Sequence, residues 1–337
     1  MSESRFFHVT PLGKLNGYPN SEEAIAAAKG GGFVWFDYFQ PAREELTQLV
    51  DSLGLHPLSI EDCFDDNQVP KIEDFPHNTF LLFNAFQVDG EDLSIDEVDL
   101  FLGANFLVTV SGTNSEDRQP MKNNQRLVEQ NLENARQGPA FLMHILLDQI
   151  VDKKFIAIET LEENINRAEE EVLADSEHFE PGQLLYQRRD LLAIRKSLFH
   201  EREILVKICR KDCAFIPEKA IYHYRDIYDH LAKFFELTEA SRDVVTSLME
   251  MYLTMLNNQM ARAANDTNNT VRRLTFITTI FMPLTLLAGI GGMSEYSMMT
   301  GSENWLSAYP AFLAGMVVLG FISYFVLIWL EKRRAKS

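Results

Sequence analysis

The sequence predicts an α+β domain, followed by long helices and then by two membrane-spanning helices near the C-terminal end. Two observations indicate this order. The first 115 of the 337 residues contain short segments rich in aromatic and β-branched side chains, whereas the chain follows a helical period from Phe141 onwards. Residues 274–337 contain two long stretches without a charged side chain, as membrane spans do.

The N-terminal domain is expected to combine strands with short helices. Strand-like composition is strongest in FVWFDYF (33–39), TFLLFNAFQV (79–88) and DLFLGANFLVTV (99–110). A helical pattern begins at Pro41, in PAREELTQLVDSLGL. The polar segment QPMKNNQ (119–125) is expected to mark the domain boundary, so the α+β domain is predicted at residues 1–120.

Long helices are predicted for the middle of the chain. Residues 121–213 are expected to form a helical hairpin, because Pro181 and Gly182 interrupt an amphipathic pattern. A long stalk helix is predicted at residues 214–273, since residues 218–282 contain neither glycine nor proline. One continuous helix over the latter range would extend for about 100 Å. The alternative is two or three shorter helices.

Two membrane spans are predicted, at residues 274–293 and at residues 306–330. Neither range contains a charged residue. About 20 helical residues cover about 30 Å, which is the thickness of a bilayer core. Residues 294–305 are expected to form a short loop between the spans, so the two spans form a hairpin.

The distribution of basic residues predicts the orientation of the spans. Arg272 and Arg273 precede the first span, and the tail at 331–337 contains four basic residues. The loop at 294–305 contains none. Because basic segments stay on the cytoplasmic side, both termini are expected in the cytoplasm and the loop outside. The beginning of the sequence lacks the basic and apolar regions of a signal peptide.

The charge of the chain argues against some classes of function. The first 273 residues contain 46 acidic and 27 basic side chains, and the whole chain has a net charge of −18. An acidic body is unsuited to nucleic acid but concentrates cations, although solubility alone is an alternative reason for it. No P-loop and no GxSxG motif is present, so neither an enzyme nor an organic cofactor is expected. Three cysteines, an odd and sparse set, indicate a reducing compartment.

One face of the predicted stalk and first span is polar but uncharged. Its members recur every three or four residues, and they are Asn257, Ala261, Ala264, Asn268, Val271, Thr275, Thr278, Met282 and Thr285. A buried polar group without a partner costs about 1–3 kcal/mol, so water or hydrated ions are expected to contact this face. Two spans cannot enclose a pore, so several subunits would have to surround it. The alternative is helix packing within the membrane, where threonine and alanine are also common.

Several motifs resemble the CorA family of divalent-cation transporters. They are HPLSIEDC (56–63), QVPKIEDF (68–75), FLGANFLVTV (101–110), LLDQIVDKKF (146–155), YRDIYDH (224–230) and LTFITTIFMPLTLLAGI (274–290). The resemblance implies a funnel-shaped homopentamer in the cell (inner) membrane, with the first spans lining the pore. It implies Mg²⁺, Co²⁺, Ni²⁺ or Zn²⁺ as the transported ion, and Mg²⁺ or Zn²⁺ as the regulatory ligand.

The sequence departs from this family at the end of the first span. The family usually has Gly-Met-Asn there, whereas this chain has Gly292, Met293 and Ser294, preceded by Gly291 where a bulkier residue is common. A ring of serines would be wider than a ring of asparagines and less selective, and Glu295 could attract cations to the mouth. The alternative is that Ser294 is an ordinary loop residue in a poorly conducting, membrane-bound cation sensor or scaffold.

The resemblance also implies a regulatory metal site between neighbouring subunits. Asp226 matches a family position that binds Mg²⁺ and holds the pore shut. Its partner would come from VDGEDLSIDE (88–97), in which Asp89 and Asp92 are both candidates. Carboxylate oxygens suit Mg²⁺. His223 and His230 share a helix face with Asp226, which leaves a zinc site as an alternative.

Overall fold

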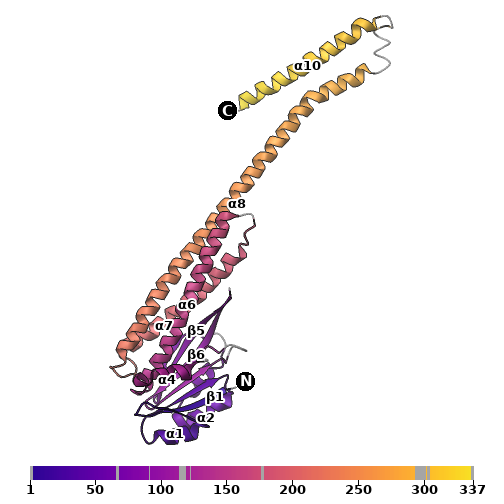
Figure 1. Cartoon of the computed structure of the whole chain (residues 1–337). Coiled ribbons are helices and arrows are strands. Elements are labelled where there is room, and N and C mark those ends of the chain that lie inside the picture. The colour runs from indigo at the N-terminus through magenta and orange to yellow at the C-terminus, as the bar shows by residue number, and fades with distance from the viewer. Residues whose placement is uncertain are drawn as a thin grey trace. The chain divides into compact units, whose positions relative to one another are not determined.

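The structure is a computed structural model that describes residues 3–65, 68–90, 92–113, 119–121, 123–175, 178–292, 301 and 304–334. The chain divides into two units, Met1–Tyr252 and Leu253–Ser337. Helix α8, Ile221–Gly291, contributes to both units. Figure 1 follows the chain from the sheet at the N-terminus to α10 near the C-terminus.

The first unit contains a seven-stranded sheet with the order β2-β1-β3-β7-β6-β5-β4. Strands β3 and β7 pair in parallel, and the other neighbours pair antiparallel. The strands are β1 (Glu3–Val9), β2 (Leu15–Tyr18), β3 (Phe33–Phe39), β4 (Lys71–Asp74), β5 (Asn78–Asp89), β6 (Asp92–Gly103) and β7 (Phe106–Ser111). The strand-like segment 99–110 therefore contains a reversal. A Cβ atom on Gly103 would lie 2.2 Å from the Phe106 ring, so this reversal requires glycine.

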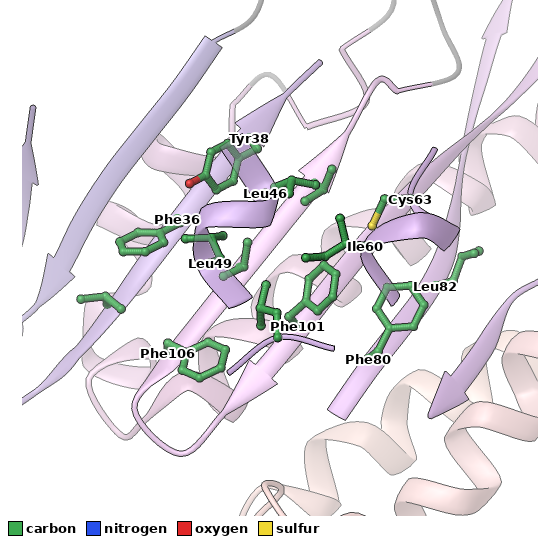
Figure 2. Packing of buried hydrophobic residues seen from close by; sticks show 14 of the residues in the cluster. Phe36, Tyr38, Leu46, Leu49, Ile60, Cys63, Phe80, Leu82, Phe101 and Phe106 are labelled. Carbon is green, nitrogen blue, oxygen red and sulfur yellow. The ribbon is translucent and has the colours of Figure 1, made fainter. Parts of the chain in front are cut away.

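Helices cover both faces of the sheet. One face packs against α1 (Ser21–Ala28), α2 (Arg43–Leu53) and α3 (Pro57–Asp62), which share one buried cluster with the sheet. Figure 2 shows Leu46 and Leu49 of α2 and Ile60 of α3 within this cluster. The other face packs against the long helix α6 (Pro139–Ala174), which contacts β3, β5, β6 and β7. The first unit thus has three layers, with the sheet in the middle.

Shorter helices and one further long helix complete the first unit. The polar segment after β7 leads into α4 (Asn124–Gln130) and α5 (Leu132–Ala135), and both pack near α6. Helix α7 is Gly182–Cys209, so α6 and α7 form two separate helices as their sequence pattern indicates. The last buried residue of α8 is Leu248, which lies in the first unit.

A buried ion pair connects the sheet to α6 and α7. The Lys154 ammonium on α6 donates to the Glu201 carboxylate on α7, and both side chains are fully buried. The backbone N–H of Asn84 on β5 donates to the same carboxylate at 3.0 Å, and the Ser197 hydroxyl donates to it at 3.2 Å. A buried pair with extra hydrogen bonds is costly to break, so this network fixes the three elements relative to one another.

The second unit consists of the C-terminal part of α8 and of α10 (Trp305–Arg334). Helix α8 is one continuous helix of 71 residues, so the alternative of several shorter helices is wrong. Pro283 lies inside it without ending it. The α+β domain, the long helices and the two apolar C-terminal helices agree with the predicted fold class.

Three carboxyl groups gather beneath α3 at the surface of the sheet. Asp99 on β6 is 1% exposed, and Asp62 at the end of α3 forms an ion pair with Lys71 at 2.7 Å. Burial, together with neighbouring carboxylates, raises the pKa of Glu97 to about 9 and that of Asp99 to about 7. The folded protein therefore holds protons here that the unfolded chain has released above pH ~5.

The stability of the protein is expected to fall between about pH 5 and pH 9, because unfolding releases these protons. Glu97→Gln cannot ionise, so it should stabilise the protein by roughly 1–2 kcal/mol at pH 9 and change little at pH 5. Thermal denaturation of the full chain in detergent measures this. Glu44→Gln, at an exposed position on α2, is the control. An equal effect of Glu97→Gln at both pH values would contradict the assignment.

Candidate functional site

Two helices of the second unit are long and apolar enough to cross a membrane, by length and composition. They are the C-terminal part of α8 and the range Leu306–Trp329 within α10, and neither is buried inside the structure. An apolar helix of 24 residues without burial is typical of a membrane span. The membrane therefore supplies the apolar surroundings that both helices lack in the isolated chain.

The predicted uncharged face occupies one exposed side of α8. All six of its predicted pore residues are exposed, namely Asn268, Val271, Thr275, Thr278, Met282 and Thr285. The hydroxyl groups of Thr275, Thr278 and Thr285 donate to carbonyl oxygens four residues earlier, at 2.8, 3.0 and 2.8 Å. Each hydroxyl hydrogen is thus already bonded within the helix, and the oxygen presents its lone pairs outward as an acceptor.

An array of outward acceptors suits a hydrated cation. Water bound to a cation directs its oxygen at the ion and its hydrogens outward, so the hydration shell is a donor surface. Mg²⁺ in particular gives up its water reluctantly and is recognised through that shell. The uncharged face can therefore accept hydrogen bonds from a hydrated ion without removing its water.

The opposite side of α8 is apolar and contacts α10 near its C-terminal end. Its half-buried residues after Val271 are Phe276, Ile280, Pro283, Leu284, Leu287 and Gly291. Thr278 and Ile280 are about 200° apart around the helix axis, so they face opposite directions. Gly291 approaches Phe312, and Leu284 approaches Gly320. One side of α8 is thus half-buried and apolar and meets α10 at Leu284 and Gly291, while the side with the threonines is uncharged and exposed.

The residues of the altered signature lie at the edge of the described chain. The N–H of Gly292 donates to the carbonyl of Ala288 at 3.0 Å and closes the last turn of α8. Met293, Ser294 and Glu295 lie outside the described residues. The predicted pore positions from Asn268 to Thr285 therefore lie on one helix, and Gly292 directly follows its last residue.

A second group of polar residues lies where α6 and α8 pack in the first unit. Asp226 on α8 is exposed, and its carboxylate is 3.9 Å from His230 one turn further on. Burial raises the pKa of Asp148 on α6, and the nearby charge of Asp226 raises it further. The rings of His144 and His223 are 4.9 Å apart, and burial lowers the pKa of His144 to about 4.

Asp148 and His144 were missed by reasoning from the sequence. His144, Asp148 and Asp152 recur every four residues in an otherwise apolar run, so they share one face of α6. This spacing could have indicated the site. Titratable side chains on one face of a mostly apolar helix are expected to lie opposite polar or charged groups of another element. The partner is the parallel stripe on α8 that contains Asp226.

The two candidates for the partner of Asp226 lie at the tip of the β5–β6 hairpin. Asp89 and Asp92 are paired with each other across its turn. Asp92 lines a pocket with Leu161 of α6 and lies near Asp190 of α7, whose pKa it helps to raise. Leu161 is 13 residues beyond Asp148, which is about 20 Å along α6, so one chain does not bring Asp92 and Asp226 together.

No group of three His, Cys, Asp or Glu side chains converges on a metal position among the described residues of one chain. A regulatory metal at Asp226 would therefore need ligands from a second copy or from water. The predicted alternative of a zinc site at His223, Asp226 and His230 is not assembled within the chain. The arrangement instead leaves a half-exposed carboxylate and imidazole surface on the α6–α8 seam.

Two apolar C-terminal helices, an uncharged polar face on the first and a separate acidic domain have the organisation of a membrane transporter for cations. The profile of the family described as "CorA-like Mg2+ transporter protein" matches residues 30–334. The chain belongs to the CorA-like Mg²⁺ transporter family. Members of this family are transporters rather than enzymes, which confirms the prediction that the chain is not an enzyme.

Curated relatives match over most of their length. The cobalt/magnesium transport protein CorA of Thermotoga maritima is 30% identical over 306 residues, which are 89% of this chain and 83% of the relative. YfjQ of Bacillus subtilis, named for metal ion transport, is 32% identical over 300 residues, which are 87% of this chain and 88% of the relative. The suspected resemblance is thereby confirmed.

Solved structures share the fold. The complete CorA magnesium transporter from Methanocaldococcus jannaschii has a TM-score of 0.69 at 21% identity, with 96% of each chain covered. The full-length CmaX protein has a TM-score of 0.67 at 18% identity, with 96% of this chain and 97% of the other covered. These likenesses agree with the α+β domain, the long helices and the two C-terminal apolar helices.

Proposed function

We propose that several copies of this chain form a channel for hydrated divalent cations, with the uncharged face of α8 lining the pore. The observation that carries the proposal is the pattern of threonine acceptors on the side of α8 that α10 leaves uncovered. Such a side is better matched to water than to lipid, because lipid offers no donors to its acceptors. A water-filled axis between subunits supplies the donors.

The proposed assembly is a homopentamer in the cell (inner) membrane with both termini in the cytoplasm. Arg272 and Arg273 before the first span, and the basic tail after the second, support this orientation. A negative-inside potential of 100 mV then adds about 4.6 kcal/mol of inward drive per divalent ion. The channel needs no other source of energy for uptake.

The transported ion is proposed to be Mg²⁺ or Co²⁺, with Ni²⁺ and Zn²⁺ also accepted. The names of the relatives from Thermotoga maritima and Methanocaldococcus jannaschii include cobalt and magnesium, which supports the first two. Ser294 supports a broader range, because a serine is shorter than an asparagine and lacks the second polar group of its amide.

Cation binding at Asp226 is proposed to hold the pore shut. The charge of Asp226 already raises the pKa of Asp148, so the two carboxylates repel each other when both are ionised. A divalent ion between subunits, shared with Asp89 or Asp92 of the next copy, would relieve this repulsion. An ion that binds the closed state more tightly shifts the equilibrium toward closure, which gives feedback from cytoplasmic Mg²⁺.

Ser294→Asn is expected to raise the ratio of Mg²⁺ to Zn²⁺ flux by roughly three- to tenfold, equivalent to about 0.7–1.4 kcal/mol in relative barriers. The physical reason is a narrower ring with amide oxygens that accept from the hydration shell. The measurement is influx into liposomes that contain trapped metal-sensitive dyes, with Ser307→Asn on α10 as the control. No flux above that of empty liposomes, together with a metal-dependent change in protease sensitivity, would instead indicate the sensor or scaffold.

Asp226→Asn is expected to weaken Mg²⁺ binding to the closed state. The Mg²⁺ concentration that gives half-maximal protection of the full chain from protease should rise about tenfold, which corresponds to a loss of about 1.4 kcal/mol in binding free energy. Limited proteolysis in detergent across a Mg²⁺ titration measures it. Asp229→Asn, exposed and three residues away on the same helix, is the matched control. Equal effects of the two substitutions would contradict a regulatory site at Asp226.

A further inference from the structure

The last residue of α8 forms a close contact with α10. A Cβ atom added to Gly291 would lie 2.7 Å from Cζ and 3.0 Å from Cε1 of the Phe312 ring. Real Cβ atoms do not approach a ring carbon so closely, so the ring occupies the space that any other residue would need. Both residues are half-buried although the rest of this surface is largely exposed.

A second contact of the same kind lies two helical turns away. Leu284 of α8 comes within 3.6 Å of the position that a Cβ atom on Gly320 would take. Gly291 and Leu284 are seven residues apart, and Phe312 and Gly320 are eight apart, so the helices run antiparallel in matching register. Each helix contributes one large side chain and one glycine, and the two contacts together set the axial position of α8 against α10.

The contact between Gly291 and Phe312 lies next to the proposed selectivity filter in the sequence, so it can affect transport. Gly291 directly precedes Gly292, Met293 and Ser294, where the proposed filter begins. The contact lies on the side of α8 that faces away from the proposed pore residues. Any displacement of the end of α8 by the Phe312 ring would therefore move Gly292, the last described residue before the signature, toward or away from the axis.

We propose that Phe312 is a positioning residue for the ion pathway, because its ring, seated on Gly291, sets the distance of the described end of α8, at Gly291 and Gly292, from the pore axis. This proposal rests on the proposed function, in which α8 lines the pore. The second span then does more than anchor the protein, since a residue remote from the ion controls the position of the end of the pore-lining helix.

If the contact sets the position of α8, substitutions at Gly291 and Phe312 should alter transport through the size of the side chain and not through its polarity or charge. Gly291→Ala adds one methyl group and must push the ring, and with it the end of α8. Phe312→Ala removes the ring and lets the end of α8 approach α10. The double variant Gly291→Ala/Phe312→Ala has room for the added methyl group, so it should recover toward the wild type. Gly315→Ala on α10 is the matched control, because nothing lies within 4 Å of its added Cβ.

The test measures Mg²⁺ and Co²⁺ influx into liposomes for the wild type and these four variants of the full chain. We expect Gly291→Ala to change the Mg²⁺ to Co²⁺ flux ratio by about threefold or more, Gly315→Ala to leave it unchanged, and the double variant to restore most of it. A ratio that is unchanged in Gly291→Ala, or a double variant in which the two effects simply add, would overturn the positioning role.

Melting temperatures of the same variants in detergent separate this proposal from the proposed function. If the wild type carries no ion, the proposed function fails and the positioning role fails with it, even where non-additive melting temperatures show that the contact exists. If the wild type carries ions and Gly291→Ala lowers the melting temperature without changing the flux ratio, the proposed function stands. The contact is then structural only, and the positioning role is overturned.

Discussion

The rest of the structure depends on one constraint, which is that a membrane does not satisfy polar groups. The C-terminal part of α8 meets this constraint differently on its two sides. Its apolar side packs on α10, and its threonines satisfy their own hydroxyl hydrogens within the helix. The remaining acceptors still need donors, and lipid provides none. In the proposed channel, a shared, hydrated axis supplies these donors.

The first unit contains the seam between α6 and α8 where the proposed regulatory cation would bind. The titratable stripes on α6 and α8 face each other at Asp148 and Asp226, on the helix that continues into the membrane. The buried pair of Lys154 and Glu201 fixes α6 against α7 and the sheet. In the proposed regulation, a cation at the seam would change the charge repulsion between α6 and α8 while α6 is held in place by this network.

Local patterns predicted much of this architecture, and long-range packing accounts for the rest. The absence of glycine and proline over residues 218–282 predicted the continuous α8, and the uncharged stretches predicted both spans. Pro283 inside α8 gave no reliable signal, because membrane helices tolerate proline. The turn at Gly103 and the contact of Gly291 with Phe312 depend on tertiary packing. The periodicity of the sequence does not reveal such contacts. Asp148 was missed because its partner lies 78 residues away in the sequence.

The claim that the uncharged face of α8 is the ion pathway is tested most directly by thiol accessibility during transport. Thr278→Cys and Ile280→Cys lie on opposite sides of the helix, and a cationic methanethiosulfonate reagent is applied to each during divalent-cation flux into liposomes. The reagent is expected to abolish flux through Thr278→Cys and to spare both Ile280→Cys and the wild type with its three native cysteines. Block at Ile280→Cys, with none at Thr278→Cys, would contradict the proposed pathway.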